Sequence, residues 1–131
     1  MEIKKAVNVQ ISEASEVYKL FNQFSEEKQE LFLVVSLNTK NKIINTHISS
    51  IGTLDSSTIH PRDIFIEAIR NNASGIILIH NHPSGDVNPS NEDLKVTKLL
   101  KNISNIIGIK LLDHLIISKD QFFSFQESGL L

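Results

Sequence analysis

Two histidines and an aspartate stand close together in one polar segment of this chain of 131 residues. His80 and His82 follow the apolar run 75–79, and Asp93 comes eleven residues after His82. Because alternate residues of an extended segment face the same side, both imidazoles can reach one point. Imidazole and carboxylate groups bind Zn²⁺, and a site with three protein ligands keeps its fourth position open for a reacting molecule. The spacing therefore predicts a catalytic rather than a structural zinc site.

The segment before Asp93 also contains a helix-start signal. Ser90 and Asp93 have the spacing of a capping box, in which each side chain accepts a hydrogen bond from the backbone N–H of the other residue. A carboxylate in the first turn of a helix is also stabilised by the helix dipole. The local pattern fits Asp93 as a cap alone and as a cap that also binds metal. The two upstream histidines favour the second interpretation.

A zinc hydrolase needs a proton acceptor as well as ligands. Zinc lowers the pKa of bound water to about 7, and a nearby carboxylate can accept its proton and pass it to the leaving group. Spacing along the chain does not select this carboxylate. Five acidic residues are candidates for the base: Glu30, Asp55, Asp63, Glu67 and Asp86.

Composition restricts the class of protein. The formal net charge of −2 gives no general attraction to nucleic acid. The absence of cysteine excludes disulfides, thiolate metal sites and cysteine nucleophiles. The length fits one domain over residues 1–131, and the sequence shows neither a signal peptide nor an apolar segment long enough to span a membrane. We therefore expect a single cytoplasmic domain without membrane contact.

Hydrophobic periodicity and turn residues predict alternating helices and strands. A first helix has Ser12 as its N-cap, and a later helix over residues 90–104 turns Val96, Leu99, Leu100 and Ile103 inward. A further helix begins at Pro61, and strands are expected over 31–37, 42–51, 75–80, 109–118 and 121–125. The first of these strands is apolar enough to be buried on both faces. This alternation indicates an α/β sandwich with helices on both faces of a sheet.

The chemistry-bearing residues resemble a known motif. Glu30 before an apolar strand, His80-x-His82, seven residues, and then Ser90-x-x-Asp93 resemble the JAMM motif of the JAB/MPN superfamily of metalloproteases. Four further stretches resemble the RadC-type bacterial JAB domain in particular: His80–Gly85, Pro89–Ser90, Asp113–His114 and Ser124–Leu131. The similarity covers nearly the whole chain.

The resemblance implies a fold, a cofactor and a reaction. The fold would be the JAB/MPN α-β-α sandwich, similar in architecture to cytidine deaminase, with a mixed central sheet. His80, His82 and Asp93 would hold Zn²⁺, Glu30 would be the general acid and base, and Ser90 would help to hold the oxyanion. The expected reaction is hydrolysis of a peptide or isopeptide bond.

The RadC-type resemblance also carries an alternative function. RadC-type proteins are associated with DNA repair, so an accessory or nucleic-acid-binding domain without proteolytic activity is the second hypothesis. Asn81 stands where eukaryotic deubiquitinating members of the superfamily carry serine or threonine.

Other polar residues receive simpler interpretations. Asp113 and His114 lie in an apolar strand, where they either orient a metal-binding histidine or form a polar pair satisfied within the sheet. We favour the second interpretation. His47 and His60 have no partner in the sequence pattern and are predicted to lie at the surface.

Overall fold

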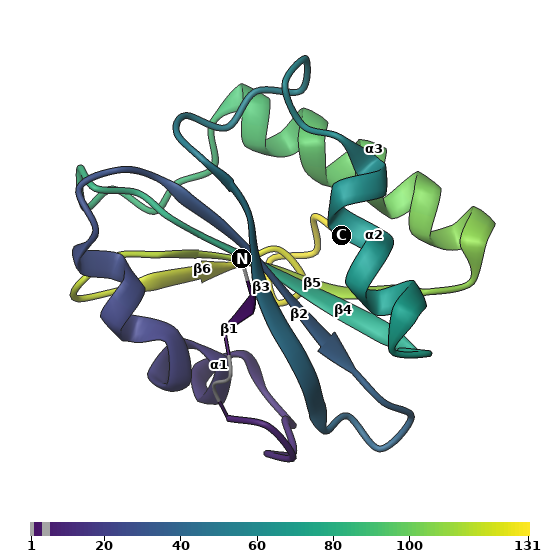
Figure 1. The fold of residues 1–131 in the computed structure, drawn as a ribbon. Coiled ribbons are helices and arrows are strands. Elements are labelled where there is room, and N and C mark those ends of the chain that lie inside the picture. The colour runs from purple at the N-terminus through teal and green to yellow at the C-terminus, as the bar shows by residue number, and fades with distance from the viewer. Residues whose placement is uncertain (1, 4–5) are drawn as a thin grey trace.

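A mixed six-stranded sheet forms the centre of the molecule (Figure 1). The computed structural model describes residues 2–3 and 6–131. Strand order is β1-β3-β2-β4-β5-β6, and among these strands β4 and β5 pair in parallel while the other neighbours are antiparallel. The strands are β1 (Glu2–Ile3), β2 (Leu31–Leu37), β3 (Ile43–Ile51), β4 (Gly75–Asn81), β5 (Lys110–Ile117) and β6 (Phe122–Ser124).

Helices cover both faces of this sheet, as the sequence predicts. Helix α1 (Ala14–Phe21), continued by the 3-10 turn η1 (Asn22–Glu26), lies on one side. Helices α2 (Pro61–Arg70) and α3 (Asn91–Ile107) lie on the other side (Figure 1). The α/β sandwich with a mixed central sheet is therefore confirmed.

Strands β2 and β4 are central and buried along their whole length. On β4, Ile76 and Leu78 pack with residues of α2 and α3, whereas Ile77 and Ile79 pack with residues of α1. Side chains alternate between faces along a strand. His80 therefore continues the face toward α2 and α3, and Asn81 continues the opposite face.

Helix α3 is longer than predicted and shows a different face to the core. It continues three residues past Ser104, to a left-handed Gly108 with φ of 77°. Leu99 was expected inside but is 38% exposed, whereas Thr97 is 2% exposed. Thr97 lies one turn after Asp93, so both face the sheet. None of the described helices is long and apolar enough to cross a membrane.

Two local predictions are wrong. Helix α1 begins at Ala14 with Glu13 as its N-cap, while both the hydroxyl and the backbone N–H of Ser12 donate to the carboxylate of Glu16. His47 is buried rather than at the surface, and its Nε2 lies 3.1 Å from the carbonyl oxygen of Asp63 in α2. His60 is exposed, as predicted.

Candidate metal centre

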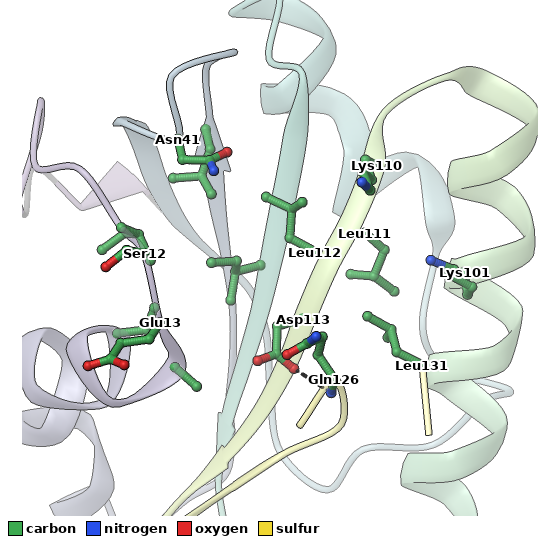
Figure 2. A pocket seen from close by; sticks show the side chains of 15 residues that line it. Ser12, Glu13, Asn41, Lys101, Lys110, Leu111, Leu112, Asp113, Gln126 and Leu131 are labelled. Carbon is green, nitrogen blue, oxygen red and sulfur yellow. Dashed lines mark hydrogen bonds between the residues drawn. The ribbon is translucent and has the colours of Figure 1, made fainter. Parts of the chain in front are cut away.

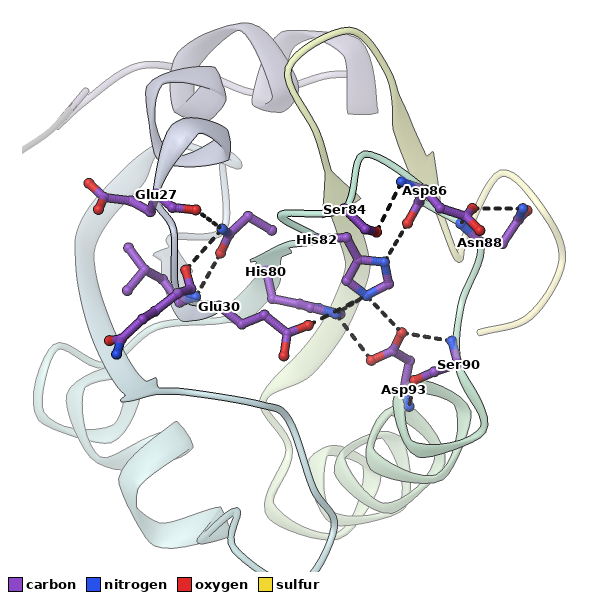
Figure 3. Close-up of polar contacts among 12 residues, drawn as sticks. Glu27, Glu30, His80, His82, Ser84, Asp86, Asn88, Ser90 and Asp93 are labelled. Carbon is purple, nitrogen blue, oxygen red and sulfur yellow. Dashed lines mark hydrogen bonds and ion pairs between the residues drawn. The ribbon is translucent and has the colours of Figure 1, made fainter.

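Three segments bring the predicted site residues together at one end of the sheet (Figure 3). Strand β2 runs antiparallel to β4, with Phe32 opposite His80. Glu30 lies two residues before Phe32, just ahead of β2, so it reaches the level of His82, two residues after His80. The first turn of α3 brings Asp93 to the same place. The antiparallel register of β2 and β4 therefore brings Glu30 close to His80, fifty positions later in the sequence.

The side-chain atoms of this cluster are in close contact. His80 Nε2 is 3.0 Å from His82 Nε2. Asp93 places Oδ1 3.1 Å from His80 Nε2 and Oδ2 3.1 Å from His82 Nε2. Glu30 lies farther out, with Oε1 3.9 Å from His82 Nε2. Glu30, His80 and His82 each offer a ligand atom within 4.8 Å of the others, a spacing that could hold a metal ion.

Asp93 is held by the predicted capping box. Its backbone N–H donates to Ser90 Oγ at 3.0 Å, and its Oδ2 accepts from the Ser90 backbone N–H at 2.8 Å. Burial favours the neutral acid, but hydrogen bonds with His80 and His82 outweigh it and hold the pKa of Asp93 far below its usual value. The buried carboxylate therefore stays ionised beside the imidazoles.

The second ring nitrogen of His82 has a fixed role. His82 Nδ1 lies 2.7 Å from the carbonyl oxygen of Asp86, which can only accept, so Nδ1 carries the hydrogen. In the neutral ring, Nε2 then presents a lone pair to the cluster. Burial lowers the pKa of His82, but hydrogen bonds to Asp93 and Asp86 and the nearby carboxylates raise it above its usual value overall.

His80 has its second ring nitrogen in contact with another histidine. His80 Nδ1 lies 2.8 Å from His114 Nε2, and His114 Nδ1 lies 2.6 Å from Thr97 Oγ1. Complete burial lowers the pKa of His114 well below its usual value, so this ring is neutral. This contact with a candidate ligand favours the other interpretation of His114, in which it orients a metal-binding histidine. Thr97 was missed because its only signal is its position one turn after Asp93.

Asp113 fits the interpretation that we favoured, a polar group satisfied within the fold. Its carboxylate accepts hydrogen bonds from Ser124 Oγ at 2.6 Å and from the backbone N–H groups of Gln126 and His114. Phe125, between Ser124 and Gln126, donates its backbone N–H to the His114 carbonyl and stacks on the His114 ring with centroids 4.7 Å apart. The C-terminal segment Ser124–Gln126 therefore encloses His114.

Asn81, between the two histidines, holds the segment that carries Glu30. Its Oδ1 accepts from the backbone N–H of Leu31 at 2.7 Å. Its Nδ2 donates to the carbonyls of Glu27 at 3.2 Å and Gln29 at 3.1 Å. These partners flank Glu30 on both sides, and Asn81 is 1% exposed. No pattern in the sequence indicates this structural role of Asn81.

Geometry separates the five candidates for the base. Glu30 is the one whose carboxylate lies within 4 Å of the cluster histidines. The other four carboxylates have different partners: Asp55 accepts from Ser57, Asp63 contacts Arg62, Glu67 pairs with Arg70, and Asp86 accepts from Asn88.

A cavity of about 520 Å³ lies elsewhere in the molecule (Figure 2). Its lining includes Ser12, Glu13, Lys101 and Gln126 and contains no member of the metal cluster. The candidate chemistry is therefore at the strand and helix ends and not in this cavity.

Comparison with known proteins agrees with the geometry. A family profile described as the RadC-like JAB domain matches residues 11–130. The chain belongs to this family. A UPF0758 protein of Pelodictyon phaeoclathratiforme is 48% identical over 132 residues, covering 100% of this chain and 60% of the relative. UPF0758 proteins of Thermotoga maritima and Clostridium perfringens are 47% and 42% identical, covering 88% and 99% of the chain and 52% and 58% of the relatives. The chain thus spans little more than half the length of these relatives.

The donor set of this RadC-like JAB domain fits a small divalent cation. Neighbouring ligand atoms of a tetrahedral zinc, with bonds of about 2.0–2.1 Å, are about 3.3 Å apart. The contacts of His80, His82 and Asp93 are 3.0 to 3.1 Å, close to that spacing. When the His82 ring is neutral, its Nε2 lone pair faces the ionised oxygens of Asp93, and a cation between them would attract both.

His82 and Asp93 are expected to stabilise the metal-free RadC-like JAB domain most between pH 3.8 and pH 6.5. These limits are the ordinary pKa values of Asp93 and His82. The raised pKa of His82 stabilises the folded state fully below 6.5, and this contribution is lost as pH rises through the raised value. The lowered pKa of Asp93 stabilises it above 3.8, and this contribution is lost as pH falls. Thermal unfolding with a chelator across this range measures the effect. His82→Gln should lose the decline above pH 6.5, and a parallel profile in both proteins would contradict the prediction.

Proposed function

We propose that this chain is a zinc-dependent hydrolase of peptide or isopeptide bonds. The observation that carries the proposal is the convergence of His80, His82 and Asp93 within 3.1 Å, with a second carboxylate, Glu30, just beyond them. Three ligands and one unbound carboxylate are the parts that metal-assisted hydrolysis needs.

Burial and distance indicate different roles for the two carboxylates, with Asp93 as a metal ligand and Glu30 as the base. Asp93 is 2% exposed and contacts both imidazoles, so it would complete the ligand set with His80 and His82. Glu30 is 21% exposed and 3.9 Å from His82, which leaves its oxygens accessible to a reacting molecule. Nitrogen and oxygen ligands in a set of three are typical of catalytic Zn²⁺.

The residues around the metal would share the proton transfers. A bound Zn²⁺ supplies Lewis acidity, which activates water as a nucleophile and polarises the amide carbonyl. Glu30 accepts the proton of the attacking water and donates it to the leaving nitrogen. Its place beside His82 and its partial exposure suit a group that meets both water and substrate.

Ser90 would stabilise the charge that develops on the substrate oxygen. Its Oγ accepts from the Asp93 backbone N–H, and within the described part of the chain its own hydrogen has no assigned acceptor. The side chain is exposed at the N-terminus of α3. The hydroxyl hydrogen is therefore free to point toward an oxyanion, where donors of this kind stabilise the transition state.

Metal content tests the proposal first. Elemental analysis of wild-type protein should find about one Zn²⁺ per chain, and His82→Ala should lose it because one of three ligands is removed. Zinc-loaded wild type is then assayed on peptides and on isopeptide-linked substrates. Wild-type protein that stays metal-free after zinc is supplied would contradict the proposal.

A further inference from the structure

Three hydrogen-bond contacts lead from His80 through the interior to the backbone of Asp93. His80 Nδ1 is 2.8 Å from His114 Nε2, and His114 Nδ1 is 2.6 Å from Thr97 Oγ1. Thr97 Oγ1 is in turn 2.7 Å from the carbonyl oxygen of Asp93. These four residues are at most 2% exposed, so bulk water does not compete for their hydrogen bonds.

The Asp93 carbonyl determines which atom donates and which accepts in each of these three hydrogen bonds. A carbonyl oxygen only accepts, so the hydroxyl hydrogen of Thr97 points toward it. Thr97 Oγ1 must then accept from an N–H at His114 Nδ1. A neutral imidazole carries one N–H, so His114 Nε2 has a lone pair and accepts from His80 Nδ1.

When His80 is neutral, this order leaves its Nε2 without a hydrogen. Nε2 is the nitrogen that faces His82 and Asp93, at 3.0 and 3.1 Å. A metal binds imidazole through the nitrogen that carries no hydrogen, and the partner of the other nitrogen determines which one that is. The opposite tautomer of His80 would place a hydrogen at the metal position.

We infer that Thr97 and His114 are positioning residues that hold His80 in its metal-binding tautomer. The inference rests on the proposed metal site, but it does not require hydrolysis. Thr97 also connects two ligands, because its hydroxyl contacts the Asp93 backbone directly and reaches His80 through His114. Removal of this one hydroxyl should therefore affect the chemistry of His80, which it does not touch.

Thr97→Val replaces the hydroxyl by a methyl group of similar volume and leaves His114 Nδ1 without an acceptor. Long-range ¹H–¹⁵N NMR of the full chain, free of metal and above neutral pH, identifies the His80 nitrogen that carries hydrogen. We expect the Nδ1–H form in wild type and a large Nε2–H population in Thr97→Val. Affinity for Zn²⁺ should fall about 10- to 100-fold. Thr97→Ser, which keeps the hydroxyl, should rescue both the tautomer and the affinity.

Specific outcomes would overturn the inference. One is an Nε2–H tautomer of His80 in wild type, a test that stands even if Thr97→Val does not fold. Another is an unchanged tautomer with unchanged zinc affinity in Thr97→Val. Wild-type protein that binds no Zn²⁺ would overturn both this inference and the proposed function. Zinc binding without hydrolysis of any substrate would overturn the proposed activity alone.

Discussion

Replacement of Glu30 by glutamine is expected to lower hydrolysis by about 100- to 10,000-fold, the range attributed to a positioned general base. Glutamine has nearly the same shape but cannot accept the proton of the attacking water. The zinc content should stay at the wild-type level, because the three closer candidate ligands, His80, His82 and Asp93, remain. Turnover at saturating substrate and elemental analysis of the same preparation measure both quantities.

Glu27→Gln is the matched control for this substitution. Glu27 lies three residues before Glu30 and is exposed. Its backbone carbonyl, and not its carboxylate, accepts the hydrogen bond from Asn81. Glu27→Gln should therefore keep full activity. A fully active Glu30→Gln would remove this residue from the mechanism, and a metal-free Glu30→Gln would make it a ligand instead.

Asn81→Ala is expected to lower both stability and activity. The substitution leaves the buried N–H of Leu31 without a partner and removes two bonds to the segment before it, at a cost of about 2 kcal/mol. Glu30 then loses the contacts that flank it, so turnover should fall more than zinc affinity does. Urea denaturation of the metal-free protein and a zinc titration measure the two effects.

Asn88→Ala provides the comparison for Asn81→Ala. Asn88 is exposed, and its side-chain amide donates to the nearby carboxylate of Asp86 at 2.9 Å. This variant should change the free energy of unfolding by less than about 0.5 kcal/mol. If the two variants are equally stable and equally active, Asn81 does not position Glu30.

Patterns local in the sequence predicted the fold and the candidate ligands. The apolar runs 31–37 and 75–79 became the central strands because both of their faces are buried. His80 lies in β4 and His82 directly follows the strand's last residue, Asn81, so the two histidines are alternate residues of one extended segment. The capping box formed because Ser90 and Asp93 lie within one helical turn, where sequence spacing determines distance.

Contacts between segments that are distant in the chain could not be predicted from the sequence. His114 meets His80 only because β5 pairs in parallel with β4, with Leu78 opposite His114. The role of Asn81 depends on β4 lying beside the start of β2. His47 was placed at the surface because nothing in its own segment shows that α2 covers it. The sequence signal for His114 was a polar pair inside an apolar strand, which has two interpretations until the neighbouring strand is known.

The enclosure of His114 by Ser124–Gln126 has a consequence for synthesis on the ribosome. The candidate ligands and the candidate base, which lie between residues 30 and 93, are made before Thr97, before His114 and before the segment that stacks on the His114 ring. A growing chain therefore carries His80 and His82 before Thr97, His114 and Ser124–Gln126 have been added. These contacts can form only after Ser124–Gln126 has been synthesised, so a chain released before that point would carry the candidate ligands without the segment that encloses His114.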